Sequence, residues 1–193
     1  MTAGFGILIA LVLVVVGVGL LRLNGLVELN RQIIEREWIK AEAANNLSSV
    51  AQANARRTIE VFFADDAALR AQKRNEILAA RASFVQSFET LQKLVYRPEG
   101  KQMLAQAEAA RQRYIGSQAR FNELLDAGER AQAQEELQQR TLPELALLQA
   151  HVDDLSKLQK QLVDESGARA QAQAQQARLL LLGVGLAGVL LGL

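Results

Sequence analysis

Two arginines and a tyrosine are the side chains best suited to bind a small anion. Arg57 and Arg111 each carry a planar guanidinium, which can donate two parallel N–H groups to one carboxylate. An apolar stripe from Leu104 to Leu125 places Arg111 and Tyr114 near the inner face of a predicted helical bundle. An arginine on that face must be paired, either with a bound carboxylate or with an Asp or Glu of the chain. The sequence leaves both interpretations open.

Gln118 and Thr141 are further candidates because of their predicted depth in the bundle. Arg57 lies about eight residues before the first predicted interhelical turn, Gln118 about nine before the third, and Thr141 about ten after it. Residues at equal distances from such turns occupy one layer of an antiparallel bundle. Thr141 also has a purely structural interpretation, because Thr141-Leu142-Pro143-Glu144 is a capping box with proline in the first turn. That pattern predicts a helix start or kink without any ligand.

The composition argues against several other kinds of site. The chain has no Cys and one His, which excludes disulfides, thiolate chemistry and zinc sites built on Cys or several His. Lys and Arg number 22 against 21 Asp and Glu, so there is no basic field for a nucleic-acid partner. The sequence pairs no nucleophile with an adjacent base and has no phosphate-binding Gly loop. We therefore expect no enzymatic activity and no cofactor or metal.

The elements that position these residues are predicted to be helices only. Between Val27 and Arg97 there is no Gly or Pro, which favours long helices over strands. Three short segments break the pattern: Ala64-Asp65-Asp66, Arg97-Pro98-Glu99-Gly100 and Asp126-Ala127-Gly128. They predict helices over 22–64, 67–96, 99–126 and 130–178. Because the connections are short, neighbouring helices should be antiparallel, and the fold class is an all-α, up-down-up-down four-helix bundle.

Apolar residues at helical spacing mark the predicted core faces of three of these helices. The stripes are Ile77, Phe84, Phe88, Leu91 and Val95; Leu104, Ala107, Tyr114, Phe121 and Leu125; and Leu145, Leu148, Val152, Leu155 and Leu162. Trp38 and Tyr96 are expected to pack as well. The two outer helices are longer than the inner pair, and two helices alone bury little surface. A second copy of the chain is therefore the expected partner, which makes the protein a homodimer.

Residues 1–21 and 179–193 are predicted to be membrane helices that flank a polar domain over 22–178. Phe5 to Leu21 carries no charge and would span about 25 Å as a helix. The first four residues contain no Lys or Arg and no cleavage site follows, so an anchor is favoured over a signal peptide. The second apolar run is still apolar at Leu193, and we expect the sequence to be the front part of a longer protein. The domain between the two runs must then lie on one side of the membrane.

Four short phrases of the chain have counterparts in a known family. They are Glu37-Trp38-Ile39-Lys40-Ala41, Asn54-Ala55-Arg56-Arg57-Thr58, Ala110-Arg111-Gln112-Arg113-Tyr114 and Leu124-Leu125-Asp126-Ala127-Gly128. With the two apolar ends and the four helices, they make the chain resemble bacterial methyl-accepting chemotaxis receptors. The resemblance covers the whole chain and is to the four-helix-bundle sensor module in particular.

The resemblance implies a homodimer in the bacterial inner membrane, with the bundle in the periplasm and ligands bound near its membrane-distal end. It also implies a cytoplasmic region beyond Leu193 that controls a histidine kinase through an adaptor. Aspartate and serine receptors of this family use arginines on the first bundle helix and a threonine near the start of the fourth. Arg56, Arg57 and Thr141 fall in matching regions, but the spacing of the arginines differs, so specificity for amino acids does not carry over.

The leading hypothesis is a transmembrane chemoreceptor sensor region that binds a small extracellular solute, or a solute-binding protein, and signals by a helix shift. If binding is direct, the arginines favour an organic acid. One alternative is the sensor region of a two-component histidine kinase or a cyclic-dinucleotide enzyme. Another is a ligand-free, membrane-anchored structural bundle, which would tolerate the loss of Arg57 and Arg111.

Overall fold

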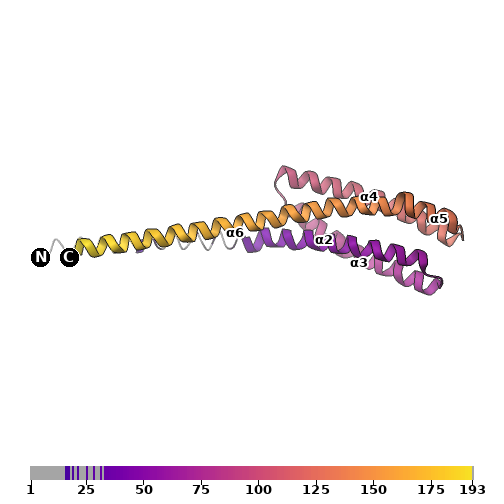
Figure 1. The fold of residues 1–193 in the computed structure, drawn as a ribbon, viewed down its shortest axis with the longest axis horizontal. Coiled ribbons are helices and arrows are strands. Elements are labelled where there is room, and N and C mark those ends of the chain that lie inside the picture. Colours follow the sequence, from indigo (N-terminus) through magenta and orange to yellow (C-terminus); the bar gives the residue numbers. More distant parts are fainter. Residues whose placement is uncertain are drawn as a thin grey trace. The chain divides into compact units, whose positions relative to one another are not determined.

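The computed structural model describes residues 33–192 continuously and isolated positions before them. The predicted membrane helix over 1–21 therefore lies almost entirely outside the described residues. In the described part all regular elements are helical (Figure 1): η1 (Ile33–Trp38), α2 (Ile39–Phe63), α3 (Ala67–Leu94), α4 (Pro98–Asp126), α5 (Arg130–Glu136), η2 (Leu137–Thr141) and α6 (Leu142–Gly192). Among these described helices, none contains a stretch that is long and apolar enough to cross a membrane.

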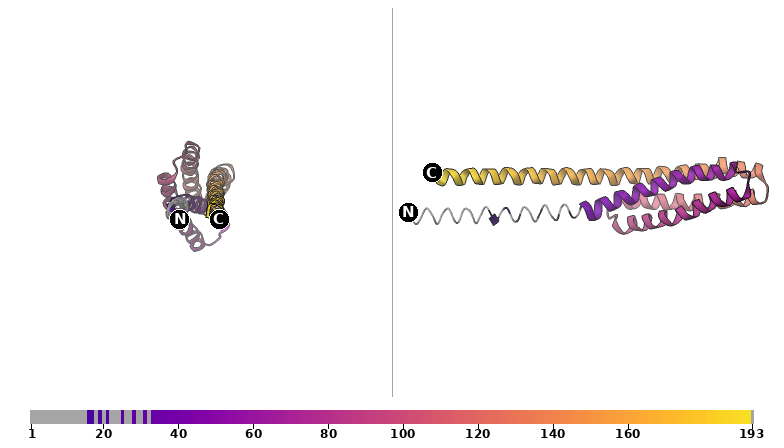
Figure 2. Two further views of the ribbon diagram at one scale, coloured as in Figure 1. Left: turned by 90° about the vertical axis from the view of Figure 1, so that its left-hand side faces the viewer. Right: turned by 90° about the horizontal axis from the view of Figure 1, so that it is seen from below.

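The chain divides into two compact units. One is Ile39–Gln161, and the other combines Met1–Trp38 with Leu162–Leu193. The first unit holds α2 to η2 and the beginning of α6, and Figure 2 shows α2 and α3 running side by side in opposite directions. Buried residues from α2, α3, α4 and α6 share one core, so this unit is an antiparallel four-helix bundle, as predicted.

The three predicted breaks between helices are confirmed, each with its local cause. The side chain of Asp66 accepts hydrogen bonds from the backbone N–H groups of Ala68 and Leu69, at 3.2 and 3.3 Å, and so caps α3. Pro98 occupies the first turn of α4, where its missing N–H leaves no helical hydrogen bond unmade. After α4, Gly128 has a φ of 78°, a left-handed conformation that glycine adopts without steric cost.

The predicted single helix over 130–178 is interrupted by the π-helical turn η2. The N–H of Leu142 donates to the carbonyl of Leu137, five residues back, instead of the usual four. Pro143 follows immediately and has no N–H, so the α-helical hydrogen-bond ladder cannot run through it unbroken. Gln138 and Gln139 are exposed, so a carbonyl that loses its donor there can bond to water. The predicted irregularity at residues 141–144 is thus confirmed, although η2 and α6 follow α5 without a break.

The core of the bundle consists of two apolar clusters. The larger combines residues 43–51 of α2, 84–91 of α3, 104–114 of α4 and 145–155 of α6. The smaller lies toward the ends of the two hairpins and includes Val61, Phe62, Ile77, Phe121, Leu124, Leu125, Ala133 and Leu137. Every residue of the three predicted stripes is buried. Helical periodicity therefore identified the inward faces of α3, α4 and α6 correctly.

The expectation that Trp38 and Tyr96 pack in the interior is wrong. Their exposed fractions are 60% and 59%. Residues Glu37 and Lys40 are buried instead of Trp38, so the inward face at the start of α2 is rotated away from the indole. Tyr96 lies in the connection between α3 and α4, outside the core, and its ring is contacted by the ammonium of Lys40 at 5.0 Å from the ring centroid.

Candidate functional site

A polar layer separates the two apolar clusters. In α3 the buried residues Ile77 and Phe84 are seven residues apart, and the exposed Arg81 lies between them on the same side of the helix, four residues after Ile77 and three before Phe84. The same alternation in α4 passes through Arg111, Tyr114 and Gln118. In α2 this layer is formed by Asn54 and Thr58, which are both buried. Polar side chains from three helices therefore lie at one level of the bundle, where Asn54, Thr58 and Tyr114 are buried and Arg81 is exposed.

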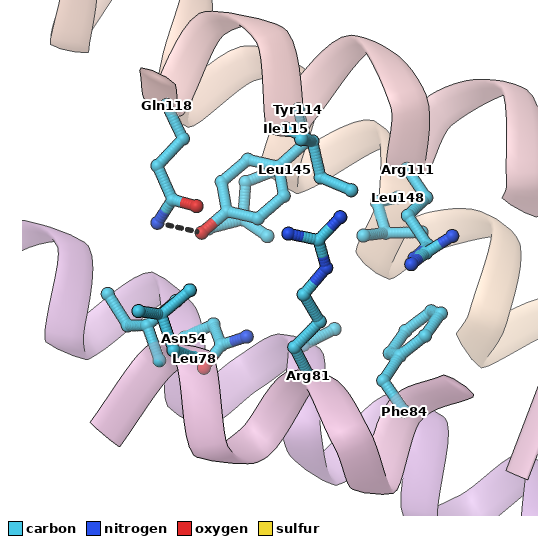
Figure 3. A pocket seen from close by; sticks show the side chains of 12 residues that line it. Asn54, Leu78, Arg81, Phe84, Arg111, Tyr114, Ile115, Gln118, Leu145 and Leu148 are labelled. Atoms are coloured by element: carbon cyan, nitrogen blue, oxygen red, sulfur yellow. Dashed lines mark hydrogen bonds between the residues drawn. The ribbon is translucent and has the colours of Figure 1, made fainter. Parts of the chain in front are cut away.

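A cavity of about 50 Å³ lies in this layer (Figure 3). Its polar lining residues are Asn54, Arg81, Arg111, Tyr114 and Gln118, and its apolar ones are Ala51, Ile77, Leu78, Phe84, Ile115, Leu145 and Leu148. No acidic side chain lines it. The cavity therefore combines two guanidinium groups and neutral polar groups with a largely apolar wall, a composition typical of sites for small organic ligands.

The two arginines of the cavity differ in how they are paired. The side chain of Arg111 is 14% exposed, and its Nη1 donates to both carboxylate oxygens of Glu108 at 3.1 and 3.2 Å. Its guanidinium carbon also lies 5.5 Å from the centroid of the Phe84 ring. The guanidinium of Arg81 points into the cavity in Figure 3 and makes no ion pair or hydrogen bond with any described residue. The cavity thus contains one positive charge without a counter-charge in the described part of the chain.

The hydroxyl of Tyr114 belongs to a hydrogen-bond chain that crosses from α4 to α2. Gln118 Nε2 donates to the Tyr114 hydroxyl at 2.8 Å, and this hydroxyl lies 3.2 Å from Thr58 Oγ1. Thr58 uses its own hydrogen to donate to the carbonyl of Asn54 at 2.8 Å, so Tyr114 must be the donor to Thr58. Burial raises the pKa of the Tyr114 phenol to about 12, and the phenol therefore stays protonated at neutral pH.

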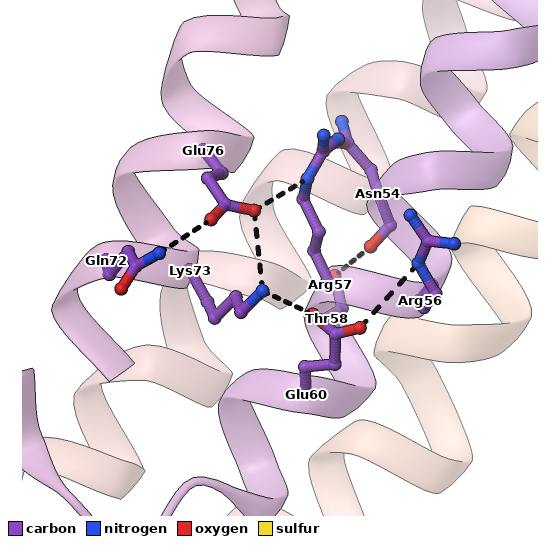
Figure 4. A network of polar contacts seen from close by, with 8 residues as sticks. All are labelled: Asn54, Arg56, Arg57, Thr58, Glu60, Gln72, Lys73 and Glu76. Carbon is purple, nitrogen blue, oxygen red and sulfur yellow. Dashed lines mark hydrogen bonds and ion pairs between the residues drawn. The ribbon is translucent and has the colours of Figure 1, made fainter. Parts of the chain in front are cut away.

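Arg57 lies outside the residues that line the cavity and joins a network between α2 and α3 (Figure 4). Its Nε is 3.3 Å from Glu76 Oε2, and its Nη1 donates to Asn54 Oδ1 at 3.3 Å. Lys73 Nζ bridges Glu60 at 3.0 Å and Glu76 at 3.6 Å. Burial acts to raise the pKa of Glu76, but the hydrogen bond from Gln72 and the charges of Lys73 and Arg57 outweigh it and lower that pKa. The network holds two helices together with charges that are already paired.

Thr141 is also outside the cavity lining. It is fully buried at the end of η2, and its hydroxyl has no hydrogen-bond partner in the described part of the chain.

Of the five predicted site residues, the structure brings together Arg111, Tyr114 and Gln118 and places Arg57 and Thr141 elsewhere. Arg81 and Asn54 line the cavity and were not predicted. A signal for Arg81 existed, because it fills the gap in the apolar stripe between Ile77 and Phe84.

The described residues contain no group of three or more His, Cys, Asp and Glu side chains that could hold a metal ion. The polar groups that line the cavity are guanidinium, amide and phenol groups.

Comparison with known proteins agrees with this architecture. A family model described as a four-helix-bundle sensory module for signal transduction matches residues 1–174. No curated protein matches the chain. The match covers most of the sequence and confirms the resemblance to the sensor region of chemotaxis receptors. The chain belongs to the family of four-helix-bundle sensory modules for signal transduction.

Proposed function

We propose that this protein is the sensor region of a transmembrane chemoreceptor and that its polar-layer cavity binds a small organic anion. The observation that carries the proposal is the convergence of Arg81 and Arg111 on a cavity that no acidic side chain lines. A guanidinium pairs well with a carboxylate that accepts two of its N–H groups. A bound organic anion would supply that carboxylate to Arg81.

Binding requires the cavity to widen. A volume of about 50 Å³ corresponds to only one or two water molecules, which is less than an organic acid fills. Leu78 and Arg81, both on α3, are the exposed residues of the lining, and the exposed fraction of Leu78 is 58%. Outward movement of these two side chains, with a small displacement of α3 from α4, would admit the ligand.

The signal would leave the cavity through α6. This helix contributes Leu145 and Leu148 to the lining and continues as one helix to Gly192. A helix displacement on the order of 1–2 Å is the kind of movement that packed interfaces convert into a switch. In the proposed receptor the apolar runs 5–21 and 179–193 anchor a homodimer in the inner membrane, with the bundle in the periplasm. A histidine kinase and its adaptor would receive the signal in the cytoplasm.

The test is thermal unfolding of the full chain in detergent against a panel of organic acids, because a ligand that binds the folded state raises its melting temperature. An acid should raise the melting temperature of the wild type, and Arg81→Gln or Arg111→Gln should abolish that rise. Arg57→Gln is the control: it removes a partly exposed cation of the same type outside the cavity lining and should preserve the ligand-induced rise.

The opposite pattern, in which Arg57→Gln abolishes the rise and Arg81→Gln preserves it, would move the site to the network between α2 and α3. No rise with any acid would refute direct anion binding. Sensing through a solute-binding protein, or a structural bundle without ligand, would then be favoured.

A further inference from the structure

The charges around the cavity define a narrower ligand class than organic anions in general. We propose that the ligand is a small monocarboxylate with an apolar body, that Arg81 is its primary cationic partner, and that the site rejects dicarboxylates and amino acids. This inference rests on the proposed function and concerns the same cavity.

Counting charges favours a single carboxylate. Arg111 and Glu108 already form a two-point ion pair at 3.1 and 3.2 Å, so this arginine brings no net charge to the site. Arg81 is the one cation of the lining without a counter-charge among the described residues. One carboxylate on Arg81 would neutralise the cavity. A second carboxylate would have to approach Arg111 against the negative charge of Glu108.

The side-chain amide of Asn54 is a neutral hydrogen-bond donor in the same cavity as the Arg81 guanidinium. Arg57 can only donate, so the atom of Asn54 that faces it at 3.3 Å must be Oδ1. The Nδ2 of Asn54 then points away from Arg57 toward the cavity, as Figure 3 shows, and makes no hydrogen bond with any described residue. Asn54 is more than nine-tenths buried. A carboxylate held by Arg81 could accept this N–H with its second oxygen.

The remainder of the lining favours an apolar body. Six large apolar side chains surround the polar groups: Ile77, Leu78, Phe84, Ile115, Leu145 and Leu148. They come from three different helices, so an apolar group inserted among them would be enclosed from several sides. Burial of such a group is favourable, whereas a hydrated second charge would lose its water without finding a partner.

The same lining disfavours the ammonium group of an amino acid. An ammonium needs acceptors and a nearby negative charge, and no Asp or Glu lines the cavity. Asn54 Oδ1 already accepts from Arg57 and the Tyr114 hydroxyl accepts from Gln118, so Gln118 Oε1 is the remaining neutral side-chain acceptor of the lining. An ammonium would also lie beside the guanidinium of Arg81, which has no counter-charge among the described residues. Repulsion from this cation should exclude it.

The experiment compares three ligands with the same four-carbon backbone by titration calorimetry on the full chain in detergent. Butyrate carries one carboxylate, succinate carries two, and 4-aminobutyrate carries one carboxylate and one ammonium. We expect butyrate to bind at least about tenfold more tightly than either of the others, since like-charge contacts in a desolvated site are costly. Arg81→Gln should remove butyrate binding, and Arg81 is exposed, so this variant should fold.

A second variant, Glu108→Gln, tests whether the charge of Glu108 causes the weaker binding of succinate. It frees the charge of Arg111, and it should therefore strengthen succinate binding and narrow the difference between succinate and butyrate. Tighter binding of succinate or 4-aminobutyrate than butyrate in the wild type, still lost in Arg81→Gln, would overturn the monocarboxylate class while leaving the anion site in place. Failure of all three ligands, and of the wider acid panel, would overturn the proposed function as well.

Discussion

The phenolic oxygen of Tyr114 on α4 lies 3.2 Å from Oγ1 of Thr58 on α2, and both side chains are buried. This contact links the α2–α3 hairpin to the second hairpin at the level of the cavity. Because Gln118 donates to the same hydroxyl, the phenol satisfies hydrogen-bonding groups on both helices. The polar layer therefore connects the two hairpins by hydrogen bonds and is also a candidate binding site.

Tyr114→Phe should lower the free energy of unfolding by about 1 kcal/mol, because it deletes the hydroxyl and leaves its partners unsatisfied. Denaturant unfolding of the full chain, with Thr58→Val and the double variant, gives the coupling energy between the two residues. Thr90→Val is the control, because Thr90 bonds only to the carbonyl of Gln86 in its own helix. Strictly additive effects of the Tyr114 and Thr58 changes would contradict a direct hydrogen bond.

The raised pKa of Tyr114 should make stability fall at alkaline pH. The unfolded phenol ionises with a pKa of about 10, whereas burial raises the folded value to about 12. Below pH 10 both states are protonated and the contribution of Tyr114 is fully present. Between pH 10 and 12 only the unfolded state loses the proton, so this contribution should decline by up to about 1.4 kcal/mol per pH unit.

Two variants isolate this effect. Tyr96 is the other tyrosine of the chain and is exposed, so Tyr96→Phe leaves Tyr114 as the sole phenol whose ionisation an ultraviolet titration can follow. Tyr114→Phe should unfold with a shallower alkaline dependence than the wild type, the remainder arising from other groups. Ionisation of Tyr114 near pH 10 in the folded protein would show that the phenol is open to water.

Thr141→Val should raise the free energy of unfolding by about 1 kcal/mol. The Thr141 hydroxyl is fully buried without a partner in the described structure, and an unsatisfied buried hydroxyl costs free energy that a methyl group of similar shape does not. Thr58→Val is the matched comparison, because Thr58 is equally buried but hydrogen-bonded, and that change should be destabilising. Destabilisation by Thr141→Val, measured in the same denaturant series, would mean that the hydroxyl is hydrogen-bonded in solution.

Asp66→Ala should lower the free energy of unfolding by about 1 kcal/mol, the usual cost of removing a helix N-cap. Its carboxylate accepts the N–H groups of Ala68 and Leu69, which otherwise have no partner within α3. Asp65→Ala removes the same charge one residue earlier, and this side chain makes no capping bond. Equal effects of the two variants on the denaturation midpoint would attribute the change to charge instead of capping.

The sequence alone determined the three breaks between the helices and which faces of α3, α4 and α6 are buried. These properties are local. Asp66 caps the N–H groups that follow it, Pro98 and Gly128 restrict or free the backbone at their own positions, and apolar spacing marks one face of each helix. Arg111 and Tyr114 were predicted for the same reason, since they lie near the apolar stripe of a single helix, whereas Gln118 was predicted from its distance to the turn after α4.

The tertiary structure alone decided which polar side chains meet. Distance from a turn predicts the level of a residue in the bundle but not its direction around the helix axis, and Arg57 and Thr141, which were chosen by such distances, lie outside the cavity lining. Arg81 fills the gap in the apolar stripe between Ile77 and Phe84, which indicates its side of α3, but this pattern does not show that it lines the same cavity as Arg111. Direction depends on how four helices rotate against one another as their apolar faces pack, and that packing joins residues far apart in the chain.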